Sequence, residues 1–501
     1  MKECNSPAPL LTTSSSLESA LESLPPGLSG CLVVPLLATV QLIAEFSHGQ
    51  VSPESACDFE QRLGELLREV GRRPLEWVYN HCEPDDPGLL PTTIKLEGVW
   101  YRRNHRKTAN RNVATLFGKI TLMRYLYRPI EDLVPCIFPL ELRLGLEAAR
   151  ATAALAGRVG QYAAQHTQQT VLQTLGRDHG VAWSVSTLRK VTAAVAQGMA
   201  EHRHAAQVAK LLDLLREAGK GGRQAILCVG RDGIFTPIRK LRGYCEAAVA
   251  TVSVLDHLGK RLGTVYLGHM PQEGQGTLSD QLTSLILEVL KGWDGPQPRL
   301  VYVTDAGHHQ TKYFKKLLRR LRHPVTGRRL RWEWVLDYYH ACQYITTLGE
   351  VLFGQGRDAA AWAAKMRRWL KDKPKGIHRV LHSAAALRSL RGLVGSPGDF
   401  EDAYNYLRKR IAHLDYHGYR RRRLPIGSGV TEACCKTVVT QRMKQSGMTW
   451  EIEGGQTIMD LRVVYLSGIW EAVYAAHLHA KNVQTLHTQL DNHRIGHQNA
   501  A

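Results

Sequence analysis

The chain has 501 residues, of which 44% are hydrophobic and 22% are charged, as in soluble proteins with ordinary cores. That length accommodates two to four domains. Lys and Arg number 65 against 45 Asp and Glu, so the net charge is +20 and the sequence pI is about 9.6. This excess favours a polyanionic partner, with nucleic acid ahead of an anionic membrane.

The N-terminal part of the sequence argues against a membrane protein. Residues 1–28 are rich in Ser, Pro and Thr, which predicts disorder, and they lack the pattern of a signal peptide. The most apolar early stretch, residues 31–46, is interrupted by polar residues and is predicted to be too short to span a bilayer. The ten cysteines form no CxxC pair and no zinc-like spacing, which predicts reduced thiols in a cytoplasmic protein without a membrane partner.

Residues 29–215 are predicted to form a mainly helical region that faces DNA. Apolar residues recur every three to four positions from Phe59 to Val70, as on one face of a helix. Residues 100–129 then mix basic and aromatic side chains, which suits phosphate contact and base stacking but equally a solvated strand edge, and residues 120–127 alternate like a strand or hairpin.

Residues 167–196 have the layout of a helix-turn-helix. A first helical pattern ends at a turn that contains glycine, and a second begins at Ser184 or Ser186. Arg189 and Lys190 lie near the start of this second helix, where a recognition helix would contact DNA. An ordinary helical hairpin remains the alternative.

The pattern changes from helical to strand-like after about residue 216. Five short apolar runs and two amphipathic helices alternate in the order strand, strand, strand, helix, strand, helix, strand. The runs are 225–235, 246–255, 261–270, 300–303 and 331–340, and the helices are 278–289 and 312–322.

Three of these strands are predicted to end near an aspartate, namely Asp232, Asp305 and Asp337. Ligand groups gather at the strand ends of α/β sheets, although a single Asp there is usually a turn or cap residue. The order of the elements is that of a ribonuclease-H-like mixed sheet of five strands, in which the first and fourth strands are neighbours. Asp232 and Asp305 are therefore expected to face each other.

A fourth acid, Glu432, lies in the stretch 424–450, which is predicted to be a Gly-Ser-Gly turn followed by about four turns of helix. Its spacing to Val439 and Met443 predicts that all three share one apolar face. Because an unpaired carboxylate is costly to bury, Glu432 is either an ion-pair partner of Lys436 or a metal ligand.

Four segments together resemble one family of proteins. GRDGIF, VTDAGHH, LDYYHACQYI and LPIGSGVTEACCK with RMKQSGMTW look like the ISKra-type bacterial insertion-sequence transposases, a DDE family related to the Mutator-like superfamily. The resemblance covers about residues 220–475. The sequence departs from the usual pattern by Thr-Asp-Ala-Gly in place of Thr-Asp-Gly-Ala and by Gly-Arg before the first Asp.

The resemblance implies a DNA transposase that cleaves at element ends and transfers strands. Asp232, Asp305 and Glu432 match the DDE acids, and three such carboxylates can hold two Mg²⁺ or Mn²⁺ ions. Asp337 and His340 match an Asp-x-x-His signature; His340 would contact the scissile phosphate, orient Asp337 or simply pack. The implied partners are double-stranded DNA of the element ends and of the target, and further copies of the chain in a homo-oligomer.

The predicted organisation completes this interpretation. A ribonuclease-H-like core occupies 216–345 and 425–478, interrupted by a helical insertion at 346–424, and a tail follows at 479–501. The alternatives are a stand-alone metal-dependent nuclease and a catalytically inactive DNA-binding relic. Basic residues on both sides of the core are expected to contact DNA phosphates. They are Lys315, Lys316, Arg319, Arg320, Arg420, Arg421, Arg422, Lys436, Arg442 and Lys444.

Overall fold

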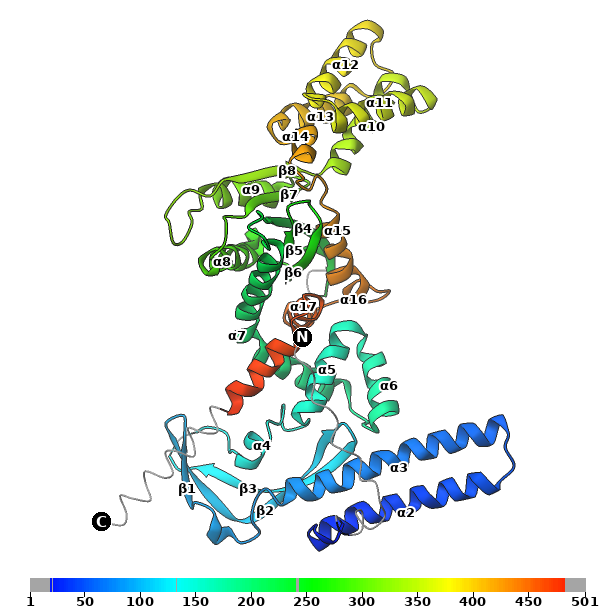
Figure 1. Cartoon of the computed structure of the whole chain (residues 1–501), viewed down its shortest axis with the longest axis vertical. Coiled ribbons are helices and arrows are strands. Elements are labelled where there is room, and N and C mark those ends of the chain that lie inside the picture. The colour runs from blue at the N-terminus through cyan, green and yellow to red at the C-terminus, as the bar shows by residue number, and fades with distance from the viewer. Residues whose placement is uncertain (1–18, 20, 132, 240–242, 483–501) are drawn as a thin grey trace. The chain divides into compact units, whose positions relative to one another are not determined.

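The computed structural model of the chain describes residues 19, 21–131, 133–239 and 243–482 (Figure 1). The predicted disorder of residues 1–28 and the predicted tail at 479–501 lie largely outside these ranges. The chain forms two compact units: residues 1–195 together with 475–501, and residues 196–474. Each unit is described by itself.

The first unit begins with two long helices, α2 (Pro26–His48) and α3 (Pro53–Asn80), which pack side by side as a hairpin (Figure 1). Ser52 caps α3 by accepting a hydrogen bond from the backbone of Ser55, and the Phe46 and Phe59 rings stack across the hairpin. The prediction that the early apolar stretch is too short to span a membrane was wrong, because this stretch is part of a longer helix. By length and composition alone, residues 27–48 could cross a membrane, and few of these residues are buried.

A three-stranded antiparallel sheet follows, with the order β1 (Thr93–Leu96), β2 (Val99–Thr115) and β3 (Gly118–Pro129). The strand predicted at residues 120–127 is confirmed as part of β3. The preceding basic and aromatic residues form β2, in which Tyr101, Asn110 and residues 113–115 are buried and the other side chains are exposed or half-buried. The first region is therefore not only helical: its basic stretch is one strand of a sheet.

Helices α4 (Pro139–Arg143), α5 (Ala153–Gln165) and α6 (Gln168–His179) come next. Gly180 ends α6 in the left-handed conformation with φ of 62°, which glycine adopts readily. Helix α7 (Val185–Ala218) begins after Ser184, whose hydroxyl accepts a hydrogen bond from the Thr187 backbone. The predicted pair of helices is present, but the second has 34 residues and crosses the boundary between the units.

The C-terminal end of the described chain belongs to the first unit, not to the predicted closing helices at 425–478. His477 is buried and contacts the buried Glu147 carboxylate at 2.7 Å, and Lys481 pairs with the same carboxylate. Burial alone would raise the pKa of Glu147, but these two hydrogen-bond donors outweigh it and hold the pKa below its ordinary value. A contact between positions 330 residues apart leaves no local pattern in the sequence.

The second unit is built on a mixed sheet with the order β6-β5-β4-β7-β8. Strands β4, β5 and β6 form antiparallel pairs, whereas β4, β7 and β8 run parallel to one another. The five predicted strands and their chain order are confirmed. Their bounds are β4 (Ile226–Ile238), β5 (Gly243–Leu255), β6 (Arg261–His269), β7 (Arg299–Thr304) and β8 (Trp332–Leu336).

Helices α8 (Gly276–Gly292) and α17 (Ile452–Leu466) contact β6, and α9 (His308–Lys316) follows β7. The apolar stripe predicted for α8 is confirmed, since Leu278, Leu282, Leu285, Ile286 and Val289 are fully buried in the core with the sheet's inward side chains. The basic helix is shorter than predicted: α9 ends at Lys316, and residues 318–320 form a 3₁₀ turn.

The predicted insertion at 346–424 is helical, and its first helix begins earlier, directly after β8. Trp362 and Met366 of α11 and Phe400 of α13 are buried in one apolar cluster that continues into the core of the sheet. Its helices are α10 (Tyr338–Phe353), α11 (Arg357–Asp372), α12 (Gly376–Arg391), α13 (Pro397–Arg408) and α14 (Tyr416–Arg421) (Figure 1).

Candidate active site

Asp232 lies on β4, and Asp305 directly follows the neighbouring parallel strand β7. The β4–β7 register ends with Gly230 beside Val303, so Asp232 and Asp305 each come two residues after the last pair, at the same edge of the sheet. The prediction that these two acids face each other is therefore supported by the register. One detail differs: β4 does not end near Asp232 but continues to Ile238 as a hairpin with β5, so Asp232 lies within a strand and pairs with Val249.

The helix that carries Glu432, α15 (Gly429–Cys434), packs on β4 and β5. The Thr431 hydroxyl is 2.9 Å from the Thr251 hydroxyl of β5, and both side chains are buried. A Cβ atom at Gly230 would lie 1.8 Å from Thr431 Oγ1, so only glycine allows this approach. Because side chains alternate along β4, Asp232 points to the same face as Gly230, toward α15.

The helix after Glu432 is not the regular α-helix that the sequence predicts. Residues Cys435–Thr440 form a π-helical turn, and α16 (Gln441–Met443) closes the segment. A π turn takes up extra residues and shifts all later side chains around the axis. Val439 and Met443 are buried as predicted, but Glu432 is exposed, so the expectation that it shares their apolar face was wrong.

Asp232 is half-buried and held by two donors. Its Oδ1 accepts a hydrogen bond from the Gly233 backbone at 2.8 Å, and the Cys435 thiol donates to Oδ2 at 3.2 Å. Burial raises the pKa of Asp232 to about 6 against the effect of these donors, and the charges of Asp305 and Glu432 act in the same direction as burial. Three carboxylates are thus close enough to influence one another.

Asp337 is not a free ligand but a fully hydrogen-bonded cap. It is 1% exposed and caps α10 by accepting from the His340 backbone at 2.6 Å. Its other oxygen accepts from the backbone and the hydroxyl of Ser428, in the turn before α15. Asp337 therefore ties the end of β8 to the segment that carries Glu432, which gives it a positioning role.

Ser428 also contacts the site directly. Its Oγ is 2.9 Å from Asp337 Oδ2 and 2.7 Å from Glu432 Oε1. A hydroxyl has one hydrogen, so Ser428 can donate to only one of these carboxylates at a time. The arrangement leaves negative charge at Glu432 that a cation would compensate. Among the described ion pairs, none joins Glu432 to Lys436, so the alternative explanation of Glu432 as a simple helix ion pair is not supported.

His340 lies in the first turn of α10, not at the end of a strand as expected. Its ring contacts Tyr344 and Tyr406 edge-on, with centroids 5.3 and 5.7 Å apart, and these two tyrosines stack at 3.8 Å. The Tyr406 hydroxyl donates to the Asp305 carbonyl at 2.8 Å. The histidine therefore packs in an aromatic group that joins the insertion to the second aspartate. Its contact with the scissile phosphate and its orientation of Asp337 stay predictions.

The donor atoms of Asp232, Asp305 and Glu432 are oxygens, the type that Mg²⁺ and Mn²⁺ prefer. As the side chains stand, no group of three or more His, Cys, Asp or Glu in the described part of the chain is close enough together to hold a metal ion. The donor set fits such an ion, but the carboxylates have to converge further on binding. At present Gly233 and Cys435 donate to Asp232, the Gly307 backbone donates to Asp305, and the Ser428 hydroxyl contacts Glu432.

Most of the predicted DNA-binding residues of the second unit are exposed, and two of the arginines are engaged in ion pairs. Arg420 pairs with Asp372, and Arg422 pairs with Glu333. Arg442 does not fit the prediction, because it is 1% exposed and its guanidinium lies over the Trp450 ring. Arg420 and Arg422 are exposed, as are Lys315, Lys316, Arg319, Arg320, Arg421 and Lys436, while Lys444 is half-buried. In the first unit, Arg189 and Lys190 are exposed, and Arg189 donates to Gln168 at 3.2 Å.

Sequence reasoning missed Ser428, Cys435 and Tyr406 as parts of this site. Ser428 and Cys435 lie four residues before and three residues after Glu432, a spacing that puts them near Glu432 on a helix facing the strands. Tyr406 comes from α13, about 100 residues after Asp305, and only the fold brings the two together.

The chain matches no protein-family model, and a comparison with curated proteins finds no similar sequence.

Proposed function

We propose that this chain is a DNA transposase with a ribonuclease-H-like core, and that Asp232, Asp305 and Glu432 carry the cleavage and joining of DNA strands. The observation that carries the proposal is the parallel pairing of β4 and β7, because Asp232 and Asp305 each come two residues after its last pair and α15, which carries Glu432, packs on β4 and β5. The strand order β6-β5-β4-β7-β8, with two antiparallel and two parallel pairs, supports this kind of core. The net charge of +20 suits a DNA substrate.

In this proposal the three carboxylates hold two Mg²⁺ or Mn²⁺ ions when DNA binds. When bound, ions held by these carboxylates would supply charge stabilisation for the attacking and departing oxygens at phosphorus. The chain's own groups set the geometry. Gly233 and Cys435 orient Asp232, while Asp337 and Ser428 fix the segment that presents Glu432.

The Tyr406 hydroxyl fixes the backbone at Asp305, so the insertion takes part in forming the site. We propose double-stranded DNA of the element ends and of the target as substrates, and a homo-oligomer bound to the DNA in the bacterial cytoplasm. The alternatives are a nuclease that cleaves without joining and a DNA-binding protein without catalysis.

The test is cleavage and joining of a labelled duplex that carries the ends of the element encoding this chain. Wild type is compared, with Mg²⁺ and with EDTA, with Glu432→Gln and with the control Glu453→Gln, an exposed acid at the start of α17. We expect metal-dependent joining that Glu432→Gln reduces at least about 10³-fold while it retains DNA binding, and a control within twofold of wild type.

Cleavage without joining would establish the nuclease instead. Binding without chemistry in any metal, wild type included, would contradict both enzymes and leave the DNA-binding protein.

A further inference from the structure

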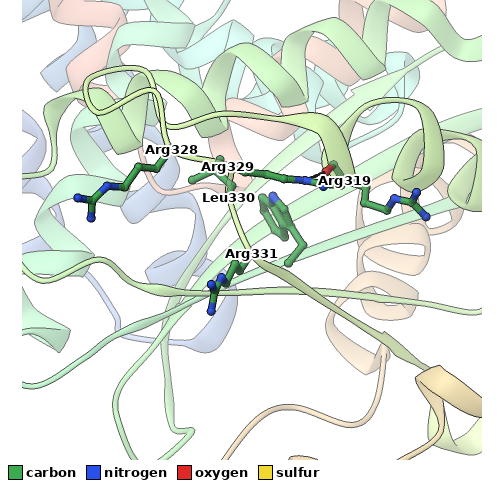
Figure 2. Close-up of a pocket in the computed structure, with 6 residues that line it drawn as sticks. Arg319, Arg328, Arg329, Leu330 and Arg331 are labelled. Carbon is green, nitrogen blue, oxygen red and sulfur yellow. Dashed lines mark hydrogen bonds between the residues drawn. The ribbon is translucent and has the colours of Figure 1, made fainter.

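A hollow rich in arginine lies beside the start of β8, at the end of that strand opposite Asp337. It has a volume of about 800 Å³ and is lined by Arg319, Arg328, Arg329, Leu330, Arg331 and Trp332 (Figure 2). None of these residues is acidic. Arg319 follows α9, and the others belong to the turn and the residues that lead into β8.

Three of the four arginines are available to a ligand. The side chains of Arg319, Arg328 and Arg331 are exposed, and within the described part of the chain no hydrogen bond or ion pair is found for them. Arg329 has a structural role, because its Nε donates to the Arg319 carbonyl at 2.9 Å and closes the turn. The Trp332 indole Nε1 is a buried donor without an acceptor in the same part of the chain. A ligand that brings oxygen atoms would satisfy it.

The directions of the arginines distinguish an extended ligand from a small one. In Figure 2 the side chains of Arg328, Arg319 and Arg331 point away from one another, so their guanidinium groups do not converge on one point. A single phosphate cannot reach all three. Negative charges spaced along a chain, as in a DNA strand, can.

We infer that this hollow binds the phosphate backbone of duplex DNA on the flank of the reacting site. From Trp332 to Asp337 is five residues of β8, or about 16 Å at roughly 3.3 Å per residue. Phosphates of one DNA strand follow each other about every 3.4 Å along the axis. The contacted phosphates therefore lie about five or more nucleotides from the scissile one. The distance from the scissile phosphate rests on the proposed function, whereas the binding of DNA phosphates by these arginines does not.

The experiment compares Arg328→Ala/Arg331→Ala with the control Lys260→Ala/Arg261→Ala, which removes two exposed cations near the β5–β6 turn. Binding of the full chain to the element-end duplex is measured from 50 to 200 mM salt without Mg²⁺, and thermal melting shows that both variants fold. We expect Arg328→Ala/Arg331→Ala, the pocket variant, to bind DNA about 10-fold more weakly at the lower salt. The slope of its log affinity against log salt concentration should be smaller by about 2, and the affinity of the control should stay within twofold of wild type.

Ethylation of single phosphates then locates the contact. Modification about five to eight nucleotides from the cleavage position should weaken binding of wild type but not of the pocket variant. Equal binding by pocket variant and control would overturn the inference even if wild type joins DNA. If wild type joins nothing while the two variants still differ, the proposed function fails and the DNA contact stands. If inorganic phosphate at 10 mM abolishes the difference, the hollow is a single-anion site and the inference is wrong.

Discussion

The two ends of strand β8 carry opposite charges in opposite environments. At its C-terminal end, Asp337 is 1% exposed, and its carboxylate accepts hydrogen bonds from His340 and Ser428. At its N-terminal end, Arg328 and Arg331 are exposed and their side chains contact no partner in the described part of the chain. A buried charge must be compensated within the fold, whereas an exposed one leaves the fold unaffected when it is removed. The acidic end is therefore expected to govern stability and geometry, and the basic end to govern binding.

The largest expected effect is at the acidic end. Asp337→Ala removes the acceptor of three hydrogen bonds and leaves the His340 and Ser428 donors unsatisfied, so we expect a loss of about 3 kcal/mol in the free energy of unfolding. Urea unfolding measures it, with the exposed Asp358→Ala as control. A loss below about 1 kcal/mol would contradict the positioning role of Asp337.

Asp232 should lower the stability of the metal-free chain, in a way that depends on pH. Its pKa of about 6 exceeds the ordinary value of 3.8, so the folded chain keeps a proton that the unfolded chain releases between these pH values. The contribution of Asp232 to stability therefore falls as the pH rises from about 4 to 6, by roughly 3 kcal/mol. We expect Asp232→Asn to be more stable than wild type by about this amount at pH 7.5 and within about 0.5 kcal/mol of it at pH 4.

Thermal or urea unfolding at the two pH values checks this difference. The control Asp358→Asn should show the same difference from wild type at both. A destabilised Asp232→Asn at pH 7.5 would mean that the carboxylate is compensated in the fold, as Asp337 is.

At the basic end, the pocket variant Arg328→Ala/Arg331→Ala should leave the free energy of unfolding within about 0.5 kcal/mol of wild type. Its exposed side chains contribute little to the folded state, and its effect should appear in DNA binding alone. Urea unfolding of the variant already made for the binding experiment measures this. A larger loss would show that these arginines stabilise the turn before β8.

The smallest effect concerns the backbone next to Asp305. Ala306 has φ of 63°, in the left-handed region that favours glycine. We expect Ala306→Gly to stabilise the chain by about 0.5–1 kcal/mol, since it relieves this strain. Ala360→Gly, on the exposed face of α11, should instead destabilise it by a similar amount. Equal destabilisation by both would show that the strain at Ala306 is negligible.

The sequence predicted the sheet better than the site. Apolar runs locate all five strands, because burial on both faces requires continuous hydrophobic residues. The extension of β4 beyond Asp232 was missed, because Thr236 and Pro237 do not look like a strand and are paired only through β5. The exposed position of Glu432 was missed as well, because the π turn at Cys435–Thr440 breaks the periodicity on which the prediction relied.

The division of the chain could not be predicted, because it depends on contacts between distant residues. The contact of Glu147 with His477 joins positions 330 residues apart. The contact of Tyr406 with Asp305 joins positions 101 residues apart. Arg442 shows that residue type alone can also mislead about burial. A basic residue in a basic helix is expected to face solvent, yet it is buried against Trp450.

The most direct test of the central claim is strand joining by Asp232→Asn, by Asp305→Asn and by the double variant, each under conditions where wild type joins DNA with Mg²⁺. Groups that act as one unit show non-additive losses, so we predict that each single variant loses as much activity as the double variant, at least about 10³-fold. Joining by either single variant within tenfold of wild type would contradict a shared site at Asp232 and Asp305.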